Sequence, residues 1–259
     1  MARYNHRPPE RAPLTLRWRT PDNPLPICVI RATRPTSEPA WHQAGMSGFV
    51  RRKDVGTLDF SARIQRLVID IASRCGDFKH IDTPRILVSV ARSRGKSLYG
   101  LQARVTPLRF PNGTLTWQRR GVPYQIQRFF LEEREFLYLM TFCLPRYLEQ
   151  EFEQKLATLF HELYHISPAF DGDLRRHEGR CTFHTRRQRD YDQQMIAYAR
   201  EYLASRPDPD LFSFLRMNFA QLQQQYGAVT GIVVPRPKMV PLVGPYAAVA
   251  SITSPRVST

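Results

Sequence analysis

Hydrophobic positions between residues 58 and 75 recur at helical spacing. They follow one another in steps of four, three, one and three residues: Phe60, Ile64, Leu67, Val68 and Ile71. This spacing puts the apolar side chains on one stripe of a helix and leaves polar residues on the opposite side. It predicts an amphipathic helix over 58–75, and Gly76 is placed to end it.

The pattern changes to short apolar runs after residue 85. Runs bounded by Gly, Pro or charged residues are typical of β-strands, and five are present: 85–92, 98–110, 114–118, 124–130 and 136–143. The sequence Pro111-Asn112-Gly113 separates the second run from the third. It predicts a hairpin turn, because Asn and Gly both tolerate the positive φ that such a turn requires.

Helical periodicity returns in the last third of the chain. It predicts helices over 150–166, 188–204 and 211–226. A helix, then several strands, then further helices is the order of an α+β protein. We therefore expect a small, mostly antiparallel sheet packed against helices.

The two ends of the chain differ in composition from the middle. Residues 1–26 are rich in Pro and Arg, which predicts an extended arm. Residues 27–56 are expected to form a loop, with one strand at the apolar run Ile27 to Ile30. Residues 231–259 are a Val- and Pro-rich tail. These features predict a single domain over 27–230 between two extensions.

The strongly positive overall charge indicates that polyanions are possible partners. Lys and Arg number 38 against 23 Asp and Glu, a formal net charge of +15 in 259 residues. Such a surface attracts nucleic acid, anionic lipid or acidic protein, although it also suits general solubility in a basic proteome. Nucleic acid therefore stays among the candidate partners.

Cysteine usage and hydropathy indicate the compartment. The four cysteines are widely spaced and form no Cys-x-x-Cys pair, which excludes a zinc ribbon and disfavours a disulfide framework. The first 26 residues hold no apolar signal segment, and no apolar run is long enough to cross a bilayer. We expect a cytoplasmic protein without a membrane partner.

The chemistry is concentrated in one five-residue motif on the helix predicted over 150–166: His161-Glu162-Leu163-Tyr164-His165. Two histidines one helical turn apart can bind the same ion, and zinc readily takes neutral imidazole as a ligand. Glu162 can take a proton from a zinc-activated water that attacks a carbonyl, and later pass it to the leaving amine. The motif predicts a hydrolase with one Zn²⁺ held by His161 and His165.

The apolar residues around the motif separate a core face from a cleft face. Four of them cluster on one side of the predicted helix: Leu156, Leu159, Phe160 and Leu163. At 100° per residue, His161 and His165 point roughly the opposite way. The helix can therefore pack on the core and still present both histidines to a cleft.

The third metal ligand has several candidates. His177 and His184 follow the second motif histidine by twelve and nineteen residues, and Cys181 lies between them. Glu178 and Glu201 are the nearest glutamates, and Glu201 falls on the next predicted helix. A histidine is the expected third ligand, because imidazole completes many zinc sites.

The charged residues between the motif and these candidate ligands can each be interpreted in two ways. Asp171 or Asp173 could orient a ligand imidazole, or form an Asp-Gly turn. Arg175 and Arg176 could stabilise an oxyanion or hold a substrate carboxylate, or belong to the general basic surface.

The stretch from Tyr138 to His184 resembles the putative phage metallopeptidases, a family of phages, prophages and bacteria. The matching pieces are Leu144-Pro145-Arg146, Leu159-Phe160-His161-Glu162-Leu163-Tyr164-His165-Ile166-Ser167-Pro168, Phe170-Asp171-Gly172-Asp173-Leu174-Arg175-Arg176 and Gly179-Arg180, with a downstream histidine. The resemblance implies a zincin-like fold, catalytic Glu162, and His161 and His165 as zinc ligands. It favours His184 over His177 as the third. A more distant similarity to SprT-like zinc peptidases implies action near DNA, but their zinc ribbon is absent here.

Two functions follow from these observations. The first is a zinc-dependent metallopeptidase acting on a protein or peptide, and the run 136–143 is either the edge strand that pairs with the substrate or a buried strand. The second is a basic, nucleic-acid-associated phage or prophage protein with a structural or degenerate zinc site. Glu162 favours the first, because a structural zinc needs no neighbouring base.

Overall fold

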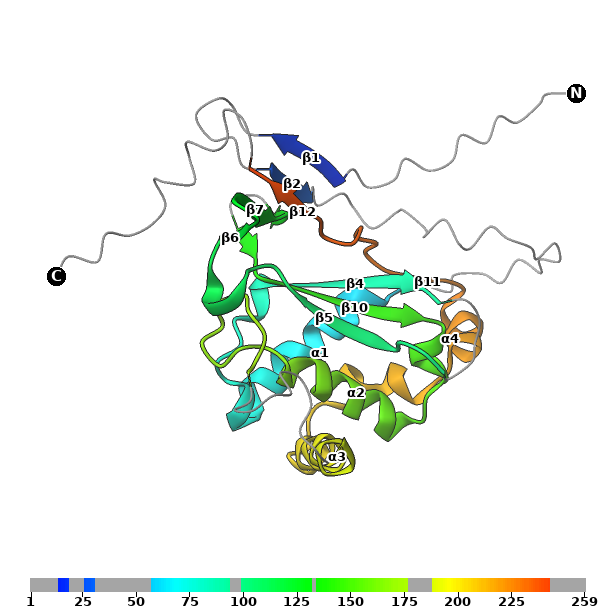
Figure 1. Cartoon of the computed structure of the whole chain (residues 1–259). Coiled ribbons are helices and arrows are strands. Elements are labelled where there is room, and N and C mark those ends of the chain that lie inside the picture. The colour runs from blue at the N-terminus through cyan, green and yellow to red at the C-terminus, as the bar shows by residue number, and fades with distance from the viewer. Residues whose placement is uncertain are drawn as a thin grey trace, which may run out of the picture.

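The computed structural model describes residues 57–93, 99–131, 134–176 and 188–242, together with two strands at 14–18 and 26–30. A central three-stranded sheet lies above two helices, and a third helix packs beneath them (Figure 1). The chain is therefore α+β, as its element order predicts.

The helices lie close to where the apolar periodicity predicts them. Their bounds are α1 Phe60–Arg74, α2 Phe152–Tyr164, α3 Gln188–Ala204 and α4 Phe219–Tyr226. Two departures are local. α1 ends at Arg74 with Cys75 as its C-cap and so stops just before Gly76, as predicted, but Gly76 begins a 3-10 helix and does not adopt the positive φ of a glycine cap. The helix predicted over 211–226 is broken into short 3-10 turns before α4 starts.

The described strands form four small sheets instead of one. Their bounds are β1 Leu14–Trp18, β2 Pro26–Ile30, β3 Leu58–Asp59, β4 Ile86–Arg92, β5 Ala103–Pro107, β6 Thr116–Arg119, β7 Val122–Ile126, β8 Arg128–Leu131, β9 Arg134–Phe136, β10 Tyr138–Leu144, β11 Val229–Thr230 and β12 Met239–Pro241. The sheet orders are β1-β2-β8-β9, β4-β10-β5, β11-β3 and β12-β7-β6. The N-terminal arm thus contains a strand, β1, that its Pro-rich composition does not predict.

The sheet nearest the motif helix is mixed. Its central strand, β10, runs parallel to β4 and antiparallel to β5. The run 136–143 is therefore not an edge strand. Of the two interpretations, an edge strand that pairs with the substrate or a buried strand, the second is correct. In the described part of the chain, the open edge on the side of α2 belongs to β5.

The hairpin predicted at residues 111–113 is confirmed as a turn but not as a hairpin between neighbouring strands. Asn112 and Gly113 adopt the positive φ angles of 59° and 70° that the sequence predicts. However, β6 pairs with β7 and not with β5, so the turn sends the chain into another sheet. The Asn112 amide bonds to the Asp173 carboxylate at 3.0 Å, which ties the turn to the segment after α2.

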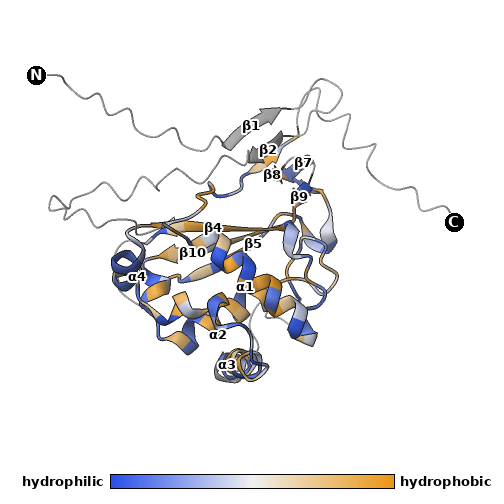
Figure 2. Cartoon of the chain, turned by 180° about the vertical axis from the view of Figure 1, so that it is seen from behind, coloured by the Kyte–Doolittle hydropathy of each residue, from blue (hydrophilic) through white to orange (hydrophobic). Residues whose placement is uncertain are grey.

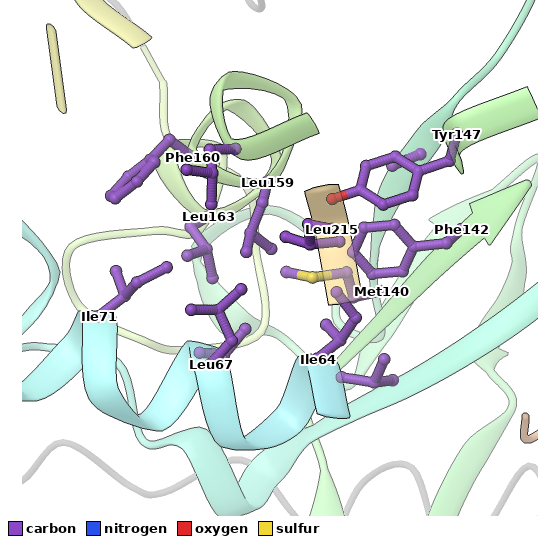
Figure 3. Packing of buried hydrophobic residues seen from close by; sticks show 14 of the residues in the cluster. Ile64, Leu67, Ile71, Met140, Phe142, Tyr147, Leu159, Phe160, Leu163 and Leu215 are labelled. Carbon is purple, nitrogen blue, oxygen red and sulfur yellow. The ribbon is translucent and has the colours of Figure 1, made fainter. Parts of the chain in front are cut away.

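One large hydrophobic core holds α1 and α2 against the central sheet. Figure 3 shows side chains of α1, α2 and β10 meeting there, including Leu67, Leu163 and Met140. A smaller cluster covers the opposite face of the sheet: Leu87, Leu108, Phe129, Phe136 and Leu139. In Figure 2 the central strands are coloured hydrophobic over most of their length, as expected for a sheet covered on both faces. None of the helices in the described ranges combines the length and apolar character needed to cross a membrane.

Candidate active site

The motif lies at the carboxyl end of α2, with its two faces separated as the sequence predicts. The apolar set is fully buried: Leu156, Leu159, Phe160 and Leu163. His161 and His165 are half-buried on another face. The His165 amide bonds to the His161 carbonyl at 3.3 Å, so the second histidine caps the helix while staying one turn from the first.

The two imidazoles converge on one point. Their Nε2 atoms are 2.9 Å apart, and the ring planes meet at 80°. Two nitrogens that each lie about 2.0–2.1 Å from one tetrahedral zinc ion are separated by roughly 3.3 Å, close to the distance seen here. The pair therefore fits two positions in the coordination shell of a single zinc ion.

Tyr191, from α3, packs against both imidazoles. Its ring centroid lies 5.0 Å from that of His161, at 90°, and 6.3 Å from that of His165, at 30°. The side chain is 4% exposed. The periodicity of 188–204 predicts Tyr191 as a core contact, but gives no sign that it borders the histidines. Only the packing of α3 on α2 brings it there.

Glu162 is buried beside the central sheet. It is 7% exposed, and its Oε2 accepts a hydrogen bond from the Val105 amide of β5 at 2.6 Å. Burial raises the pKa of Glu162 to about 7, although the Val105 hydrogen bond and the charge of Arg104 act in the opposite direction. A carboxyl group with this pKa can both accept and release a proton near neutral pH.

The backbone of β5 presents alternate residues to its open edge. Just before β5, the Gln102 carbonyl accepts a hydrogen bond from the Cys143 amide of β10 at 2.7 Å, next to the antiparallel register. Because hydrogen-bonded and non-bonded pairs alternate, the amide and carbonyl groups of Ala103 and Val105 point away from β10. The bond from Val105 to Glu162 confirms this direction. The motif helix and the open sheet edge therefore meet at Glu162.

The third ligand stays a prediction. Within the described ranges, no three His, Cys, Asp or Glu side chains are grouped closely enough to hold a metal ion. The candidates His177, His184, Cys181 and Glu178 lie outside the described residues.

Glu201 is wrong as a candidate ligand. It is ten residues after Tyr191 on the same helix, which corresponds to about 15 Å of rise. Its charge instead helps raise the pKa of the Cys75 thiol at the end of α1, although burial of the thiol is the larger cause. The sequence could not exclude Glu201, because the distance from Glu201 to the motif histidines depends on which turn of α3 packs against α2.

The aspartates after the motif build a turn. The Asp173 carboxylate accepts hydrogen bonds from the Asn112 amide and from the Arg176 guanidinium, and Asp171 accepts one from the Asp173 amide. The Tyr138 hydroxyl of β10 donates to the Asp173 carbonyl and accepts from the Gly172 amide. The turn interpretation is therefore correct for Asp173, whose carboxylate joins the segment to the turn at 111–113, while its carbonyl group joins the segment to β10.

The two arginines of the same segment differ in their contacts. Arg175 donates to the Tyr164 carbonyl at 2.8 Å and stacks its guanidinium 4.1 Å from the Tyr164 ring centroid. Arg176 forms an ion pair with Asp173 at 3.0 Å. Both therefore fix the chain that leaves α2, and Arg175 does so next to the motif.

Comparison with known proteins agrees with the geometry. The sequence matches the family described as "Putative phage metallopeptidase" over residues 60–195, a span that runs from α1 through α2 to the Tyr191 region of α3. No curated protein and no solved structure matches the chain. The match covers more than half of the 259 residues and includes both motif histidines, Glu162 and β5. The chain belongs to this phage metallopeptidase family.

Proposed function

We propose that the chain is a zinc-dependent peptidase with a zincin-like active site, in which Glu162 is the general base. His161 and His165 supply two ligands of one zinc ion, and His184 or His177 supplies the third. The observation that carries this proposal is the convergence of the two Nε2 atoms, 2.9 Å apart, next to a buried glutamate bonded to the sheet edge.

The residues divide the chemistry between them. A bound zinc ion supplies a Lewis acid that polarises a carbonyl and lowers the pKa of water. Glu162 accepts the proton released when water attacks the peptide carbonyl, and then transfers it to the departing amine. Its burial suits both steps, because a pKa of about 7 leaves either protonation state accessible near neutral pH.

The edge of β5 supports a peptide as the substrate. An extended peptide can add to a sheet edge through main-chain hydrogen bonds. Ala103 offers an amide and a carbonyl in this direction, and Val105 offers a carbonyl, while the Val105 amide bonds to Glu162. A peptide on this edge would pass next to the Glu162 carboxylate, so β5 takes the substrate-binding role first considered for 136–143.

The test is hydrolysis of a denatured protein by the zinc-loaded full chain, measured as newly formed amino groups. Glu162→Gln should lower the rate at least about 100-fold while zinc content is unchanged, because general-base catalysis contributes about 10²- to 10⁴-fold. Glu201→Gln is the matched control, since it removes an exposed glutamate remote from the site. Equal rates for Glu162→Gln and the wild type, or a zinc-loaded protein without hydrolysis, would reject the proposal and favour the nucleic-acid-associated alternative.

A further inference from the structure

A pocket of about 400 Å³ opens directly beside His161 and Glu162. Three parts of the chain form it: one face of α2, one face of α3 and residues 101–103, which lead into β5. Its apolar lining includes Ala103, Ala157 and Met195, each less than 10% exposed. The volume and these apolar residues leave room for the aliphatic part of one substrate side chain.

The charge of the pocket is opposite to that of the chain. Among the described residues that line it, the charged ones are Glu162 and Asp192 of α3, and Asp192 is exposed. No ion pair of Asp192 with a Lys or Arg of the described ranges is present. In a chain of net charge +15, this acidic rim is a local exception that attracts a cation.

The position of the pocket relates it to the peptide path along β5. Ala103 lies on the open edge of β5 and also lines the pocket. Successive side chains of an added strand point to opposite sides, so every second side chain of a bound peptide faces α2 and α3. The side chain next to the cleaved bond would therefore enter this pocket.

We infer that this pocket selects a lysine or arginine side chain of the substrate, next to the cleaved bond, and that Asp192 determines the preference. The inference rests on the proposed peptidase function. Lys and Arg have long aliphatic stems that can lie on Ala157 and Met195, with the charged end in water at the rim beside Asp192. A glutamate substrate side chain is repelled by Asp192 and by Glu162.

The experiment digests a peptide library with the zinc-loaded full chain and reads the cleavage sites by mass spectrometry. The wild type should cleave beside Lys or Arg several-fold more often than beside Gln or Met, since an ion pair at a solvated rim adds a modest selectivity. Asp192→Asn should remove this preference, and Asp192→Lys should shift it towards Glu and Asp. Glu201→Gln, also on α3 and outside the pocket, should leave the preference unchanged.

A separate measurement of peptide binding distinguishes failure of this inference from failure of the peptidase function. The affinity of the Glu162→Gln variant for matched peptides containing Lys, Gln or Glu is measured by fluorescence anisotropy, with and without Asp192→Asn. Hydrolysis with the same side-chain preference in wild type and Asp192→Asn overturns the pocket assignment and leaves the peptidase function standing. Absence of hydrolysis, with Lys-selective binding lost in Asp192→Asn, overturns the peptidase function and leaves the pocket assignment standing.

Discussion

The Glu162 carboxylate accepts a hydrogen bond from the Val105 amide at 2.6 Å, which joins the motif helix to the edge strand of the central sheet. The contact places the Glu162 carboxylate at the sheet edge to which the proposed peptide substrate would add. It also puts a carboxyl group in a buried position, with consequences for stability that can be measured without any substrate.

Glu162→Gln should stabilise the metal-free protein at alkaline pH. Burial raises the Glu162 pKa from 4.5 to about 7, so the folded state binds this proton more tightly than the unfolded state. The wild type therefore loses stability as pH rises from 4.5 through 7, by up to about 3 kcal/mol. Urea denaturation of chelator-treated protein should show the variant more stable at pH 8, with the difference disappearing near pH 4. A difference independent of pH would contradict the account.

Tyr191→Ala should weaken zinc binding, because the Tyr191 ring packs on both imidazoles and limits their orientations. Residues that orient metal ligands typically contribute about 10- to 100-fold in metal affinity. Competition with a zinc-sensitive dye measures this loss. Tyr191→Phe keeps the ring and should lose much less affinity, so equal losses in the two variants would show that the ring contact is not what matters.

Gly172→Ala should destabilise the turn that follows the motif. Gly172 has a φ of 89°, and an added Cβ would lie 2.5 Å from Cγ of the Arg109 side chain. Gly121 is the matched control, because its φ is 77° but no atom lies within 4 Å of an added Cβ. Positive φ alone costs a non-glycine residue about 1–2 kcal/mol. Thermal unfolding should show a larger loss for Gly172→Ala than for Gly121→Ala, and the reverse order would contradict the packing described.

Lys155→Met should destabilise the protein by about 1–3 kcal/mol, because two carbonyl groups lose their donor. The Lys155 Nζ of α2 is buried and donates to the Leu215 and Met217 carbonyls at 2.9 and 2.8 Å. Burial lowers its pKa to about 8. Lys238→Met, at an exposed lysine, is the control. Urea midpoints that agree between the two variants would show that the Lys155 contacts do not hold α2.

Helices and the motif geometry could be predicted from the sequence because both depend on neighbours along the chain. The i, i+4 spacing alone places His161 beside His165, and the apolar steps of α1 and α2 predict which faces are buried. Capping and breaks were less predictable. α1 stops just before Gly76, but Gly76 starts a 3-10 helix and is not a left-handed cap, and the last predicted helix is interrupted before α4.

Strand pairing could not be predicted, since it depends on residues far apart in the sequence. The run 136–143 has the same apolar character whether it is central or at an edge, and only the pairing with both β4 and β5 shows that it is central. For the same reason the roles of Val105 and Tyr191 beside the motif were not foreseen. Glu201 was placed correctly on a helix, but on a turn too distant from the histidines.

The most direct test of the account is the zinc content of the purified full chain, measured by elemental mass spectrometry after zinc is offered and excess is removed. The account predicts one zinc per chain in the wild type and in Glu162→Gln, loss in His161→Ala, and loss in one of His184→Ala and His177→Ala, which would identify the third ligand. A folded wild-type protein that retains no zinc, or a His161→Ala variant that retains it fully, would contradict the central claim.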